Sequence, residues 1–98
     1  MDLRNEATDR LFAAVLNLKS VEECYRFFED LCTVKELRDL TQRFQIATLL
    51  DEGLNYQNIV KQVDAITTTI SRVNQCLNYG SGGYRTVLDR MRAAKERT

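Results

Sequence analysis

The sequence contains no proline and no histidine, and only four glycines among its 98 residues. Proline interrupts helices more strongly than any other residue. Its absence, together with long segments that mix charged and apolar residues, predicts an all-α protein. The absence of histidine excludes a catalytic pair or triad built on an imidazole. The stretch from Asn78 to Gly83 is rich in glycine and predicts a flexible connector, because it lacks the lysine of a phosphate-binding loop.

Cysteine is scarce as well. Cys24, Cys32 and Cys76 are odd in number and show no CxxC spacing, which argues against a disulfide framework and against a zinc site. A cysteine nucleophile would need an activating base, and none is evident. The sequence therefore predicts no catalytic residues, no metal and no cofactor, and hence a protein that is not an enzyme.

Long hydrophobic runs are also missing, although apolar residues make up 44% of the chain and charged residues 29%. No apolar run approaches the length that spans a bilayer, and the first residues are too polar for a signal peptide. We therefore expect a cytoplasmic protein without a membrane partner. The length is that of one small domain, which we expect to cover residues 1–98.

The sequence does contain a series of amphipathic segments, which predict helices over about residues 2–18, 21–31, 34–51 and 84–95. Ser20 and Thr33 each stand three residues before a glutamate, the capping-box pattern at the start of a helix. The second segment should bury one face, formed by Val21, Cys24, Tyr25, Phe28 and Leu31. The third segment is apolar on more than one side, which predicts a partner subunit.

The segment from Leu54 to Leu77 has the pattern of a helix-turn-helix, with its helices at about residues 55–77. Asn55 should cap the first helix, and Gly53 should end the helix before it. In the second helix, one buried face is expected from Ile66, Ile70, Val73 and Leu77. The opposite face carries hydroxyl and amide side chains and Arg72, with no acid. Such a face suits the DNA major groove, because small hydroxyls reach base edges and arginine reaches phosphate or guanine.

The formal net charge is zero, but the charges are unevenly distributed. Residues 1–31 carry four basic and seven acidic side chains, whereas residues 67–98 carry six basic and two acidic ones. Phosphate is attracted by the local field, so the basic C-terminal part favours binding to double-stranded DNA. A solvated helix face would show the same charges, so both interpretations stay open at this point.

Two stretches resemble the Trp repressor (TrpR) superfamily, and within it the YerC/YecD-like branch. They are residues 31–63, LCTVKELRDLTQRFQIATLLDEGLNYQNIVKQV, and residues 67–84, TTTISRVNQCLNYGSGGY. The most specific part is TISR followed by NQCLNYGSGGY, and the resemblance extends over about residues 20–92. It implies a six-helix TrpR-like subunit in an intertwined homodimer that acts as a DNA-binding transcriptional regulator, expected to be a repressor. It also implies DNA contacts through Gln57, Thr67, Thr68, Thr69 and Arg72.

The resemblance further implies a pocket for an amino-acid-like corepressor, held in the family between two arginines with a threonine nearby. The corresponding residues here are Arg43, Arg72 and Thr33. Paired arginines can sandwich a ring or hold a carboxylate, but both could equally be phosphate or surface arginines. The chain departs from the family at Asp64, where glycine is usual in the turn, so we expect a turn that is strained or differently shaped.

One alternative function belongs to a different class. The protein could be a helical dimeric protein-interaction module that kept the fold and lost DNA binding, and the zero net charge and the altered turn favour this interpretation. Salt dependence separates the two hypotheses, because phosphate contacts make affinity fall steeply as salt rises.

Overall fold

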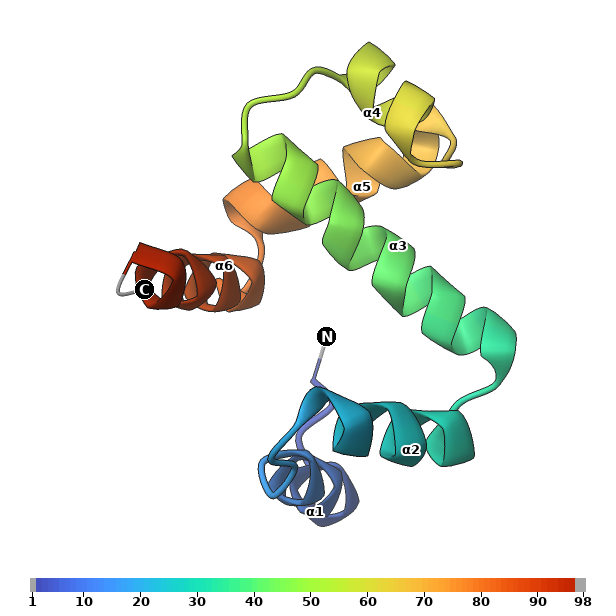
Figure 1. Ribbon diagram of the computed structural model, residues 1–98, viewed down its shortest axis with the longest axis vertical. Coiled ribbons are helices and arrows are strands. Elements are labelled where there is room, and N and C mark those ends of the chain that lie inside the picture. The colour runs from blue at the N-terminus through green and yellow to red at the C-terminus, as the bar shows by residue number, and fades with distance from the viewer. Residues whose placement is uncertain (1, 97–98) are drawn as a thin grey trace. The chain divides into compact units, whose positions relative to one another are not determined.

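The computed structural model describes residues 2–96, and these residues form six α-helices and no strand (Figure 1). The all-α prediction is therefore confirmed. In chain order the helices are α1 (Glu6–Val15), α2 (Val21–Leu31), α3 (Val34–Asp51), α4 (Tyr56–Gln62), α5 (Thr67–Tyr79) and α6 (Gly83–Glu96). None of these helices, within the described residues, is both long enough and apolar enough to cross a membrane.

Side-chain caps fix where α2 and α3 begin. At α2, the Glu23 backbone N–H donates to Ser20 Oγ over 3.1 Å, and the Glu23 carboxylate accepts from the backbone N–H of Lys19. At α3, Thr33 and Glu36 exchange two such bonds, of 2.8 and 3.1 Å, and these bonds hold the pKa of Glu36 below its usual value. Both predicted caps are confirmed. They could be predicted from the sequence because a capping box depends only on residues within one helical turn.

The described part of the chain divides into two compact units, a first unit that ends at Leu37 and a second unit that begins at Arg38. In the first unit, neither α1 nor α2 contains a buried residue. The prediction that α2 buries one face is therefore wrong for this chain alone: Val21 is 74% exposed, and Cys24, Tyr25 and Leu31 are exposed too. Phe28, on the same predicted face, is half-buried. The amphipathic pattern is real, but most of this apolar face is not covered within the unit.

The first helix is also shorter than predicted. Asn5 caps it, its side-chain oxygen accepting the Thr8 N–H over 2.8 Å, so the helix begins at Glu6 rather than near residue 2. It ends at Val15, and the next residue, Leu16, is 85% exposed.

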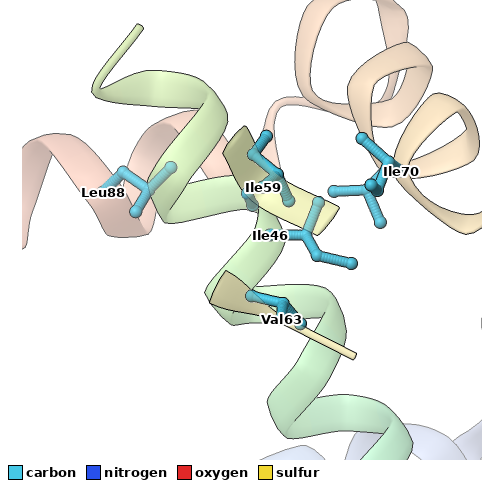
Figure 2. Close-up of a cluster of buried hydrophobic side chains, with 7 residues drawn as sticks. Ile46, Ile59, Val63, Ile70 and Leu88 are labelled. Carbon is cyan, nitrogen blue, oxygen red and sulfur yellow. The ribbon is translucent and has the colours of Figure 1, made fainter. Parts of the chain in front are cut away.

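The second unit contains the hydrophobic core of the described chain (Figure 2). Its buried side chains come from α3, α4, α5 and α6 and from the residue that ends α4. They are Ile46, Ala47, Ile59, Val63, Ile70, Val73 and Leu88. Burying one isoleucine side chain contributes roughly 1.5–3 kcal/mol, so this cluster is what holds the helix-turn-helix against α3.

The helix-turn-helix consists of α4, the turn and α5. As predicted, the Asn55 side chain caps α4 by accepting the Asn58 N–H over 2.9 Å, and α3 ends before Gly53, which takes a positive φ of 91°. Among residues 2–96 no residue other than glycine has a positive φ. Asp64 therefore avoids the left-handed conformation, and the strain expected in this turn is absent.

A long-range contact holds this turn. The side-chain amide of Gln42, on α3, donates to the backbone carbonyl of Asp64 over 2.6 Å. The turn itself is closed by a 2.8 Å bond from the Ala65 N–H to the Val63 carbonyl. Together these bonds determine the point at which the chain enters α5.

The predicted burial of Ile66 is wrong. Ile66 is the N-cap of α5, with an extended backbone (φ −85°, ψ 155°), and it is 69% exposed. Helical periodicity applies only to residues with helical dihedrals, so its side chain does not share the face of Ile70 and Val73, which are buried.

The last helix is joined to α3 by ion pairs. The carboxylate of Asp51, at the end of α3, accepts a 2.7 Å bond from Arg85 and a second bond from Arg92. The side chain of Asp51 is only 11% exposed, and the Arg85 bond is the main reason that the pKa of Asp51 lies below its usual value.

Candidate nucleic-acid interface and adjoining pocket

The outer side of α5 presents small polar side chains. Thr67, Thr68 and Arg72 are exposed, Thr69 is half-buried, and Ile70 and Val73 anchor the opposite side in the core. The helix contains no aspartate or glutamate from Thr67 to Tyr79. We call Thr67, Thr68, Thr69 and Arg72 the α5 polar face. It can donate and accept hydrogen bonds and carries a positive charge without a competing carboxylate on the same helix.

Gln57, the remaining predicted contact, lies in the first turn of α4 and is exposed. It belongs to the same compact unit as the α5 polar face. The acid nearest to α5 on its N-terminal side is Asp64, whose side chain is also exposed. An exposed carboxylate therefore lies three residues before Thr67, the first residue of α5.

The basic residues near the C-terminal end of the chain are not all available. Arg85 and Arg92 pair with Asp51, and Arg85 also pairs with Asp89 over 3.1 Å. Arg43 and Arg72, in contrast, form no ion pair with any other residue of the described range 2–96. The positive charge available to an external anion is therefore more localised than the sequence suggested.

These two arginines line one pocket, with a volume of about 330 Å³. Its walls come from three helices: Arg43 from α3, Tyr84 from α6, and Thr68, Thr69, Arg72, Val73 and Cys76 from α5. The structure thus brings Arg43 and Arg72, two of the three residues predicted for an effector pocket, to the same pocket. It also shows that the pocket shares three residues with the α5 polar face.

Thr33, the third predicted pocket residue, does not line this pocket. It lies in the first compact unit, where its hydroxyl accepts the N–H of Glu36 as the cap of α3. The cap already explains why a threonine stands at this position.

Sequence reasoning missed three lining residues, Val73, Cys76 and Tyr84. Burial raises the pKa of the Tyr84 hydroxyl, the neighbouring Cys76 adds to this shift and Arg43 opposes it. Cys76 follows Arg72 by four residues, which places both on one side of a helix, and this spacing was the available signal. Tyr84 lies beyond the glycine-rich connector, and no local pattern links it to α5.

The lining of the pocket defines what it can hold. Two guanidinium groups and two threonine hydroxyls supply donors for a carboxylate or phosphate. Val73 and the ring of Tyr84 supply an apolar wall. The arrangement suits a small anion with an apolar part.

Comparison with known proteins agrees with this architecture. The family described as Trp repressor protein matches residues 6–92. The YerC protein of Bacillus subtilis strain 168, whose function is uncharacterised, is 50% identical over 90 residues, which cover 92% of this chain and 86% of YerC.

Two crystal structures have the same fold. A candidate Trp repressor from Staphylococcus aureus superposes with a TM-score of 0.88 at 48% identity, covering 92% of this chain and 90% of that one. A TrpR-like protein from Eubacterium eligens ATCC 27750 superposes with a TM-score of 0.87 at 47% identity, and the match covers 91% of this chain and 92% of that one. With a family match over most of its length and relatives at half identity, this chain belongs to the Trp repressor family.

Proposed function

We propose that this protein is a cytoplasmic, sequence-specific DNA-binding transcriptional regulator, a repressor that acts as a homodimer of single-domain TrpR-like subunits. Membership of the Trp repressor family supports a regulator rather than an enzyme. The observation that carries the proposal is the α5 polar face, which is free of acids and backed by a rigid core.

The α5 polar face fits the chemistry of the major groove. The hydroxyls of Thr67 and Thr68 are short enough to reach base edges, while the guanidinium of Arg72 can contact guanine or phosphate. Gln57 lies in the first turn of the preceding helix and would contact the DNA backbone, as first helices of such motifs do.

Dimerisation is supported by the first compact unit. Its helices bury no residue within the chain, and Phe12, Leu16 and Val21 are among the large apolar side chains left exposed. A unit of this size cannot be stable without a core, so a second copy of the chain is the proposed cover. The same dimer would supply the second α5 that a two-half-site operator requires.

The pocket between Arg43 and Arg72 is the proposed site of a small carboxylate corepressor of amino-acid type. Because Thr68, Thr69 and Arg72 belong to both surfaces, a bound ligand would touch the side chains that contact DNA. Ligand and DNA binding would therefore be coupled through shared residues.

Selection from a randomised duplex pool tests the proposal. The purified protein is incubated with the pool at physiological salt, with and without a mixture of amino acids, and the retained DNA is sequenced. We expect an enriched, nearly palindromic motif whose affinity falls steeply with salt. Analytical ultracentrifugation of the same sample establishes whether the protein is dimeric.

Two substitutions locate the interface. Thr68→Glu places an anion against phosphate and should abolish binding, whereas Thr68→Gln has the same size without the charge and should retain much of it. If Thr68→Glu bound DNA as well as the wild type, the α5 polar face would not be the interface. A folded dimer that retains no duplex under any condition would instead favour the helical interaction module.

A further inference from the structure

We propose that Ile66 is a specificity-determining residue that contacts the 5-methyl group of a thymine in the major groove. The inference rests on the proposed function, since it assigns one base contact within a DNA interface. Ile66 was predicted to be buried, and the structure leaves it 69% exposed.

Ile66 occupies a position where isoleucine has no structural advantage. It is the N-cap of α5 and makes no side-chain capping hydrogen bond. Serine, threonine, aspartate or asparagine would supply that bond, and isoleucine is among the poorest residues for this position. The side chain does not gain burial in exchange, because it is 69% exposed.

Ile66 therefore neither caps the helix nor is buried, and such a departure from both preferences at one residue indicates a role outside the folded chain. The neighbours of Ile66 indicate which role. Thr67 and Thr68, the next two residues, are exposed members of the α5 polar face, so the exposed isoleucine directly precedes that face in the chain. The first residues of a recognition helix are those that contact base edges.

Thymine is the base that offers an apolar partner in the major groove. Its 5-methyl group distinguishes it there from the other bases, and apolar side chains contact it. Gln42 supports this contact, because its bond to the Asp64 carbonyl fixes the backbone two residues before Ile66. The isoleucine thus extends from a turn that is held in place.

Deleting the methyl group tests the proposal directly. In the selected duplex, each thymine is replaced singly by deoxyuridine, which removes the methyl and keeps the base pair. Affinities are measured by fluorescence anisotropy. For the wild type, we expect the replacement of one particular thymine in each half-site to lower the affinity about fourfold, which is the effect of burying one methyl group. Ile66→Ala should bind the thymine and deoxyuridine duplexes equally.

Matched variants separate this role from others. Thr67→Ser removes a neighbouring methyl but keeps the hydroxyl, and Val60→Ala shortens another exposed aliphatic side chain, 44% exposed on α4. Both should keep the thymine preference. Ile66→Ser should lose the thymine preference. Because serine supplies the missing capping hydrogen bond, this variant should unfold at a higher urea concentration than the wild type.

Several results would overturn the proposal. These are a selected site without thymine, a thymine preference that persists in Ile66→Ala, and a preference lost in Thr67→Ser instead. Weaker dimerisation of Ile66→Ala with an unchanged preference would show that protein covers the residue. If the wild type retained no duplex, the proposed function would fail as well, whereas DNA binding without methyl sensitivity overturns the Ile66 contact alone.

Discussion

Ile66 and Ile70 are the same residue type, four positions apart, and the structure gives them opposite environments. Ile70 is 0% exposed, within the cluster of Ile46 and Ile59, whereas Ile66 is 69% exposed. Truncating each to alanine removes the same atoms. We therefore predict that Ile70→Ala lowers the free energy of unfolding by about 2–5 kcal/mol, the usual cost of such a cavity. Ile66→Ala should change it by less than about 0.5 kcal/mol.

The loss expected for Ile70→Ala is large relative to the total free energy of unfolding. A domain of this size has an unfolding free energy of roughly 5–15 kcal/mol, so Ile70→Ala removes a substantial part of it. With a urea m value of about 1–3 kcal/mol/M, a loss of about 3 kcal/mol lowers the midpoint by roughly 1–3 M. Ile70→Val leaves a smaller cavity and should cost only about 0.5–1.5 kcal/mol.

Urea unfolding followed by circular dichroism measures all three variants. The protein concentration must be kept constant, because the midpoint of a dimer depends on it. If Ile70→Ala cost less than about 1 kcal/mol, or if the two alanine variants behaved alike, the described packing of α5 would be incorrect.

Substitutions at three other residues test separate contacts. Because Arg85 lowers the pKa of Asp51, the carboxylate stabilises the fold fully above the ordinary pKa that it has in the unfolded chain. It loses this effect as the pH falls through the lower pKa of the folded state. The urea midpoints of wild type and Asp51→Asn should therefore differ by a constant amount from neutral pH to about pH 5 and converge in more acidic solution; a difference independent of pH would refute this. Gln42→Met removes the donor to the Asp64 carbonyl and should weaken binding to the selected duplex about fivefold, which is the effect of losing one hydrogen bond. In the same anisotropy titrations, the affinity for unselected DNA should not change. Arg43→Leu should abolish the binding of a carboxylate ligand measured by calorimetry, and Arg43→Lys should retain part of that binding. If the wild type and both variants bound the ligand equally, the ligand would lie outside this pocket.

Features that depend on adjacent residues could be predicted from the sequence. The predicted caps at Ser20, Thr33 and Asn55 and both predicted ends of α3, including the end before Gly53, agree with the structure. Each depends on interactions within one helical turn, which the order of residues specifies directly.

Features that depend on distant residues could not be predicted. The bond from Gln42 to Asp64 joins residues 22 positions apart, and the pocket combines Tyr84 of α6 with residues of α3 and α5. The periodic pattern also identified an apolar face on α2 but could not show that this chain leaves Tyr25 and Leu31 exposed. A hydrophobic pattern indicates that a face needs cover and does not identify the cover.

The residues shared by the pocket and the α5 polar face have a consequence for how such a regulator can evolve. A substitution at Thr69 or Arg72 that adapted the pocket to a new ligand would also change the surface proposed to contact DNA. Effector specificity and operator specificity would then be inherited together rather than varied independently. A lineage that acquired a new ligand through these positions would need matching changes in its operators, so the two would diversify in paired steps.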